Sequence, residues 1–292
     1  MRIADNTRLD SILRNITSNQ QRLVDASRQA SSGQRLTAPS DDPVAAAQLV
    51  RIQARIDDTQ GYRSVLRTVT GDLELAESSL DGAHQVLDRL HEIALQGADG
   101  ALTASERSSM ADEVVQLKQQ LFQTANQKGS LGYLFAGTND QSAPFASDGS
   151  FLGNAQDKVA VVGAGQSMVV SASGAKAFTT AGGSDMFAQV DALAKALATN
   201  DQTAVSASVN SLDGCMRQVL AARTDVGLKL ERAQTADAAH EQASVALSTQ
   251  RSAVGDVNPA EAYTRLSSLQ QGLQQSIEVA KQLLSSLSAQ RF

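Results

Sequence analysis

The side chains most capable of catalysis or metal binding are few and widely spaced. His84 and His91 stand seven residues apart in a helical pattern, so they share one helix face but lie two turns apart, too far to bind one metal ion. His240 replaces an apolar residue in a heptad row, where a histidine held by a neighbouring group is a simpler interpretation than a ligand. The sequence therefore predicts no metal-ligating residues.

Three other motifs resemble pieces of active sites without completing one. Gly163–Gly165 begins like a dinucleotide-binding loop but lacks the third glycine and the following helix, so it predicts a β-turn. The carboxylates of Asp41 and Asp42 are neighbours in sequence and point apart on a helix, which favours capping over acid–base chemistry. Cys215 has no defined base near it and is expected to be inert packing. We therefore expect no catalytic residue, no cofactor and no enzymatic activity.

Composition and charge disfavour several classes of protein. With 292 residues, 42% of them hydrophobic, the chain is long enough to bury the cores of two domains. The net charge of −6 and the lack of a basic stripe argue against nucleic-acid binding. No apolar run reaches the roughly 18 residues of a spanning helix, and the N-terminus lacks the apolar segment of a cleavable signal peptide. Taken alone, these features indicate a soluble chain with no membrane partner and favour the cytoplasm.

Apolar residues at heptad spacing mark both ends of the chain and form the strongest pattern in it. A helix with such a seam cannot bury it alone, so each terminal helix needs a partner. The residues predicted from the two rows to form an assembly interface are Leu9, Ile12, Ile16, Leu23, Ala26, Ala30, Leu266, Leu269, Leu273, Ile277, Ala280, Leu283 and Leu287. Apolar heptads also serve as the core of an intramolecular bundle, but the position of these rows near both chain ends favours self-assembly as a hypothesis.

Start and stop signals for helices divide the chain into segments. Among these signals is a capping-box pattern at Thr103 and Glu106, and the long helix predicted from Pro43 carries a heptad row that includes Leu66, Leu73, Leu80 and Leu87. The predicted segments are an N-terminal assembly helix and connector at 1–42, a helical rod domain at 43–136 and 185–257, a β-rich surface insertion at 137–184, and a C-terminal assembly helix at 258–292. The insertion holds eight of the twenty glycines, together with short runs rich in Val and Phe. The predicted fold class is mainly α: a long antiparallel, coiled-coil-like helical bundle from both termini with a small β-rich inserted domain.

Short motifs along nearly the whole chain resemble the flagellin family. The sequence Ser-Ser-Gly-Gln-Arg-Leu at 31–36 and Asp-Asp-Pro at 41–43 resemble its N-terminal region. Gly-Tyr-Leu-Phe-Ala-Gly-Thr at 132–138 is similar to a stretch typical of its hook-associated protein 3 branch, and residues 223–227 and 256–262 match the C-terminal half. Two positions depart from the pattern: Gly255 stands where an acidic residue is common, and Asn258 where Asp is usual. Asn caps a helix as well as Asp does, so the start of the last helix is retained.

The resemblance implies a structural adaptor of the bacterial flagellum that joins the hook-associated region to the flagellin filament. It implies four partners: the first hook-associated protein on the proximal side, flagellin on the distal side, copies of the chain itself in a ring, and a flagellar export chaperone. It also implies type III export without a cleaved signal, and therefore an extracellular location at the hook–filament junction instead of the cytoplasm.

Two alternatives remain open from the sequence. The first is a filament-forming flagellin, against which the signature at 132–145 counts, that is, the motif at 132–138 with Pro144-Phe145 shortly after it. The second, less favoured, is a type III needle-tip or translocator protein, which would need an apolar hairpin that the pattern lacks.

Overall fold

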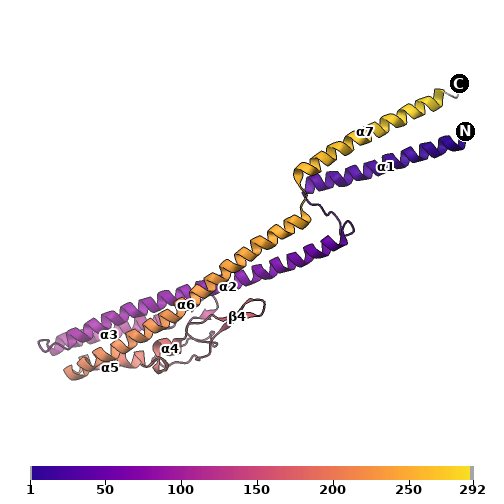
Figure 1. The fold of residues 1–292 in the computed structure, drawn as a ribbon. Helices are drawn as coiled ribbons and strands as arrows, with labels where there is room; N and C mark the ends of the chain where they lie inside the picture. Colours follow the sequence, from indigo (N-terminus) through magenta and orange to yellow (C-terminus); the bar gives the residue numbers. More distant parts are fainter. Residues whose placement is uncertain (1, 290–292) are drawn as a thin grey trace. The chain divides into compact units, whose positions relative to one another are not determined.

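The structure is a computed structural model that describes residues 2–289; the side chains of residues 2–6, 8, 9, 283 and 286–289 lie outside this description. The described chain is mainly helical, with a small β component, which confirms the predicted fold class (Figure 1). Its elements are α1 (Arg2–Ser32), α2 (Pro43–Gly97), α3 (Ala104–Ala125), β1 (Lys128–Gly129), β2 (Gly132–Tyr133), β3 (Val159–Gly163), β4 (Gln166–Val169), α4 (Gly174–Phe178), the 3-10 helix η1 (Thr180–Gly182), α5 (Met186–Ala198), α6 (Gln202–Gly255) and α7 (Pro259–Ala289).

The chain divides into two compact units. The central unit spans Thr59–Gln242, and the terminal unit comprises the residues up to Asp58 and from Ala243 onward. The terminal unit therefore contains α1, α7, the first part of α2 and the last part of α6. Each unit has its own cluster of buried apolar side chains, and that of the terminal unit is small, with Ile52, Ile56 and Leu247 as its buried members.

Local capping chemistry sets the helix boundaries where the sequence predicts them. Thr103 and Glu106 form a capping box at the start of α3, in which the Glu106 N–H donates to Thr103 Oγ1 and the Thr103 N–H donates to Glu106 Oε2. The Ala260 N–H donates to Asn258 Oδ1 at 3.0 Å, so Asn258 caps α7. At the end of α1, Gly33 adopts a φ of +70°, a conformation that glycine reaches without steric cost.

In the central unit, α2 and α6 pack in antiparallel orientation around a leucine-rich core. The ion pairs Arg63–Asp237 and Arg223–Glu77 join the two helices at N–O distances of 3.0 and 2.6 Å. The residue numbers of the partners rise on one helix while they fall on the other, as antiparallel packing requires. The heptad row of α2 is fully buried, and its leucines are Leu66, Leu73, Leu80 and Leu87.

A buried arginine binds backbone carbonyl groups at the C-terminal end of α2, in the central unit. Arg107, on the first turn of α3, donates to the carbonyl oxygens of Gly97, Leu102 and Asp99 at 2.8, 2.9 and 2.5 Å, and to Asn200 Oδ1 at 2.5 Å. Gly97 and Asp99 mark the end of α2, and Asn200 lies in the turn between α5 and α6. One guanidinium therefore binds the last carbonyl group of α2 and two carbonyl groups of the turn that leads to α3.

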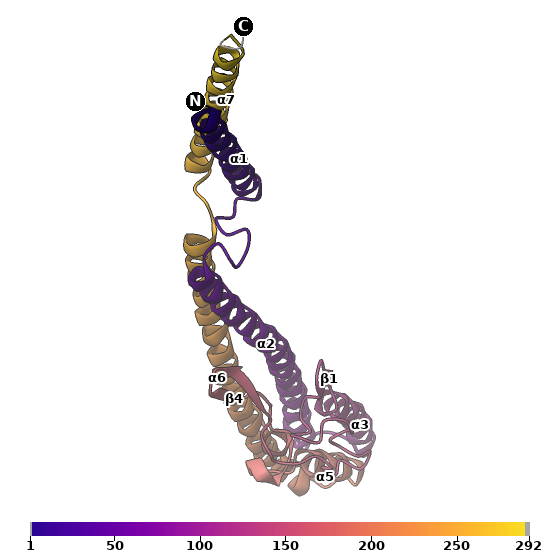
Figure 2. The ribbon, with the colours of Figure 1, turned by 90° about the vertical axis from the view of Figure 1, so that its right-hand side faces the viewer.

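The inserted segment is held to the rest of the central unit by aromatic packing. Strands β3 and β4 form an antiparallel hairpin, with the predicted turn at Gly163–Gly165 confirmed at its tip. The hairpin lies alongside α6 (Figure 2), where His240 Nε2 is 2.7 Å from Val162 O. The Phe145 ring packs on Phe178 and Phe187 with centroids 5.5 and 5.3 Å apart. These rings join the core of the central unit.

Candidate assembly site

Helices α1 and α7 of the terminal unit lie side by side and run in opposite directions (Figure 1). Each helix is 31 residues long, and the described residues nearest the two chain termini lie at the same end of the pair. This arrangement brings the two predicted apolar rows together within one chain.

The paired rows remain largely half-exposed. Ala26 is the buried member of the N-terminal row, with 3% of its surface exposed, whereas Ile277 of the C-terminal row is 37% exposed. The half-buried members are Ile12, Ile16, Leu23, Ala30, Leu266, Leu269, Leu273 and Ala280. The side chains of Leu9, Leu283 and Leu287 lie outside the described residues. Two helices alone thus leave much of this apolar surface accessible to a further partner.

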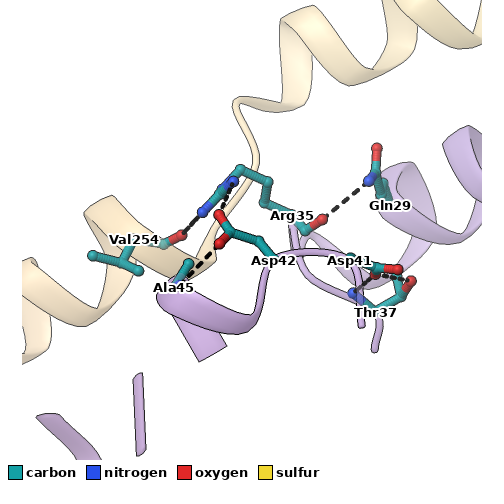
Figure 3. Close-up of polar contacts among 7 residues, drawn as sticks. All are labelled: Gln29, Arg35, Thr37, Asp41, Asp42, Ala45 and Val254. Carbon is teal, nitrogen blue, oxygen red and sulfur yellow. Dashed lines mark hydrogen bonds and ion pairs between the residues drawn. The ribbon is translucent and has the colours of Figure 1, made fainter. Parts of the chain in front are cut away.

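Arg35 joins the connector between α1 and α2 to the end of α6 (Figure 3). Its Nε and Nη2 atoms donate to Val254 O at 3.1 and 3.0 Å, and its Nη1 lies 3.5 Å from Asp42 Oδ2. Its backbone N–H donates to Gly255 O at 2.7 Å, and its carbonyl accepts from Gln29 Nε2 at 3.0 Å. We call Gln29, Arg35, Thr37, Asp41, Asp42, Ala45 and Val254 the Arg35 cluster.

The Arg35 cluster satisfies the ends of two helices at once. The carbonyl groups at the end of α6 lack intrahelical partners and carry partial negative charge, which the guanidinium of Arg35 neutralises. Asp42 accepts from the Ala45 N–H at 3.0 Å at the start of α2. The hydrogen bond from the Ala45 N–H is the main cause that lowers the pKa of Asp42. The pKa of Asp41 is lowered mainly by the hydrogen bond from the Ala38 N–H, and further by bonds from the hydroxyl and the N–H of Thr37. Because both pKa values are lowered, both carboxylates are charged at neutral pH and these contacts are present. They are lost as the pH falls below the ordinary pKa of aspartate, about 4, and through the lowered pKa values of Asp41 and Asp42.

The sequence did not identify Arg35 as a residue of the assembly site. Arg35 stands in the Ser-Ser-Gly-Gln-Arg-Leu motif, in a connector next to predicted helix ends. A cation at such a place is suited to binding the last carbonyl groups of a helix, and this was the available signal.

Replacement of Arg35 by Ala should loosen both connectors without unfolding the central unit. We expect amide hydrogen exchange at 33–42 and 255–258 to accelerate about tenfold, because charge-assisted bonds to Val254 are lost. Exchange within Thr59–Gln242 should stay unchanged. The matched control is Arg51→Ala, which removes an exposed arginine of α2 in the same unit. Equal exchange in Arg35→Ala and the parent protein would contradict the role given to the Arg35 cluster.

Of the side chains first considered for chemistry, His91, His240 and Cys215 have structural environments. His84 Nε2 lies 3.9 Å from Asp88 Oδ2, and its buried Nδ1 makes no hydrogen bond within the described residues. His91 Nε2 lies 3.2 Å from Asp213 Oδ1, and His240 is held by Val162 O as expected. Cys215 is buried, and burial is the main cause that raises its pKa to about 11, so the thiol stays protonated at neutral pH. Within the described residues, no group of three His, Cys, Asp or Glu side chains is placed to hold a metal ion. None of the described helices is long and apolar enough to cross a membrane.

Comparison with known proteins defines the class to which this architecture belongs. Residues 3–140 match the model of the bacterial flagellin N-terminal helical region, and residues 209–289 match that of the flagellin C-terminal helical region. The two matches together span most of the chain, including both terminal helices. The chain therefore belongs to the flagellin family, and it is a structural protein of the flagellum and not an enzyme.

Within this family the chain is similar to flagellar hook-associated protein 3. It is 28% identical to that protein of Escherichia coli and 27% identical to that of Salmonella typhimurium, in each case over 88% of this chain and 89% of the relative. A solved structure, the putative flagellar hook-associated protein from Vibrio parahaemolyticus, superposes with a TM-score of 0.68 at 26% identity, over 73% of this chain and 99% of that one. The resemblance predicted from the short motifs is thus confirmed.

Proposed function

We propose that this chain is the adaptor that joins the hook-associated region of the flagellum to the flagellin filament. The observation that carries the proposal is its similarity, over 88% of its length, to proteins named flagellar hook-associated protein 3. The proposed partners are the first hook-associated protein on the proximal side, flagellin on the distal side and further copies of the chain in a ring.

The proposed mechanism is coupled folding and assembly of the terminal helices. Apart from Ala26, the described members of the two apolar rows keep a substantial part of their surface accessible when α1 pairs with α7. An isolated helix with one apolar stripe is marginally stable, so the remaining surface has to be covered before the ordering entropy is offset. Neighbouring copies at the growing tip provide that cover, and the interface consists of the predicted residues from Leu9 to Ala30 and from Leu266 to Leu287.

The segments predicted from the sequence take different roles in this proposal. Residues 1–42 and 258–292 form the inner, assembling layer, residues 43–136 and 185–257 form the outer helical rods, and residues 137–184 form the outer surface. An export chaperone covers the C-terminal helix before the chain leaves through the flagellar type III channel. The final location is extracellular, at the hook–filament junction.

Labelling of intact flagella with gold-conjugated antibody against the purified protein tests this location. We expect label at one site per flagellum, where the hook meets the filament. Label along the whole filament would contradict the junction role and favour the filament-forming alternative. Absence of label from flagella, together with leakage of liposomes exposed to the protein, would favour the translocator alternative.

A further inference from the structure

Each of the two apolar rows is interrupted by one polar residue. In α1, Asn19 occupies the heptad position between Ile12 and Ala26. In α7, Ser276 occupies the corresponding position between Leu269 and Leu283. An apolar side chain at either position would bury more surface, so the polar residues need a separate explanation.

The two interruptions meet each other in the structure. Asn19 Nδ2 donates to Ser276 Oγ at 3.2 Å, and both side chains are half-buried. Ser276 Oγ in turn donates to Gly272 O at 2.8 Å within its own helix. The Ser276 hydroxyl therefore accepts a hydrogen bond from α1 and donates one within its own helix, α7. These two bonds use its single donor and one of its two acceptor sites.

Regular heptad rows do not by themselves fix how far one helix is shifted along the other. A shift of seven residues, about 10 Å along the axis, places apolar residues opposite apolar residues again. After such a shift Asn19 would face the position of Leu269 or Leu283, and Ser276 would face Ile12 or Ala26. The amide would then lose its partner in a half-buried setting, which disfavours the shifted arrangement.

We propose that Asn19 and Ser276 set the register of α1 against α7. The register decides which apolar residues of the two helices lie at the same level, and therefore which composite surface the pair offers to another protein. A single polar position in a heptad row is known to specify register at some expense of stability. At one end of the pair, the Arg35 N–H donates to Gly255 O and the Val257 N–H donates to Gly33 O, so a shifted register also has to break these bonds. The Asn19–Ser276 hydrogen bond adds to this penalty in the middle of the pair.

Disulfide cross-linking of the full-length protein tests the proposal, with the native Cys215 replaced by Ala. The native register is reported by Asn15→Cys with Gln275→Cys, because both residues line the same small groove between α1 and α7. The register shifted by seven residues is reported by Arg8→Cys with Gln275→Cys. Both pairs are oxidised with the same reagent, and the ratio of shifted to native product is measured.

Two double variants of Asn19 and Ser276 are compared with a control variant at exposed positions. In the double variant Asn19→Leu/Ser276→Leu, we expect the ratio of shifted to native product to rise about tenfold, because the penalty on shifted registers is gone. Gln21→Leu/Gln271→Leu adds the same side chains at exposed positions outside the rows and should leave the ratio unchanged. The exchanged pair Asn19→Ser/Ser276→Asn keeps the hydrogen-bonding groups and should retain the native register.

Two results would overturn the proposal. One is a cross-linking ratio in Asn19→Leu/Ser276→Leu equal to that of the unsubstituted pair. The other is the absence of the native cross-link in the parent protein, because the two helices would then not pair as described. Neither result bears on the junction role, which the labelling of flagella tests separately.

Discussion

Replacement of Leu273 by Asp is expected to abolish incorporation of the protein at the hook tip while the central unit stays folded. Leu273 is a half-buried member of the apolar row of α7, on the helix that pairs with α1. A carboxylate there would have to lose water without gaining a partner when a neighbouring copy covers the row, which strongly disfavours assembly. Because Leu273 lies outside Thr59–Gln242, the core of the central unit is unaffected.

The measurement for this variant is complementation of a strain that lacks the gene. We expect non-motile cells with bare hooks, and a purified variant whose main thermal transition matches that of the parent. Gln274→Asp is the matched control, since it places the same charge at the adjacent, exposed position and should restore filaments. Normal incorporation of Leu273→Asp would contradict the role proposed for the apolar rows.

Replacement of Arg107 by Leu is expected to destabilise the central unit by about 2–3 kcal/mol, the cost typical of leaving buried polar groups without their hydrogen-bond donor. Arg107 is 4% exposed and donates four hydrogen bonds, three of them to backbone carbonyl oxygens near the end of α2. A leucine fills the space but donates nothing, so those oxygens are left without this donor. For a unit of this size the melting temperature should fall by about 5–10 °C.

Thermal and urea unfolding of the purified protein measure this effect. Arg217→Leu makes the same substitution at an exposed position of α6 and should shift the melting temperature by less than about 2 °C. Arg107→Lys should remain closer to Arg107→Leu than to the parent, because a lysine has only three donors and lacks the planar fork of arginine. A melting temperature of Arg107→Leu within 2 °C of the parent would show that the four hydrogen bonds contribute little.

The sequence predicted best those features that depend on local spacing. The heptad row from Leu66 to Leu87 lies in the core, and the capping residues Thr103 and Asn258 mark the helix starts. Both kinds of signal act between residues a few positions apart, so they are visible in a single stretch of chain. The pairing of the terminal rows with each other follows from the same reasoning, because each row needs a partner.

Contacts between distant segments were not predictable in the same way. Arg35 and Val254 are 219 positions apart, and nothing in either stretch specifies that they meet. The Asn19–Ser276 hydrogen bond likewise depends on the register of two helices at opposite ends of the chain. Spacing within one helix identifies a row but not its alignment with another row.

Gly255, which departs from the family pattern, lies close to Leu49 of α2. Gly255 is buried, and a Cβ atom added there would lie 3.2 Å from Leu49 Cδ2. A side chain at this position would require the end of the Leu49 side chain to shift by a few tenths of an ångström. The Gly255 carbonyl accepts instead from the Arg35 N–H, which links the position to the Arg35 cluster through its backbone.

Electron microscopy of a strain that lacks this gene, with flagellin assayed in the culture medium, tests the central claim most directly. If the chain joins the hook-associated region to the filament, the cells should carry hooks without filaments and release unpolymerised flagellin into the medium. Expression of the wild-type gene from a plasmid should restore the filaments. Filaments still attached to hooks in the deletion strain would contradict the proposed junction role.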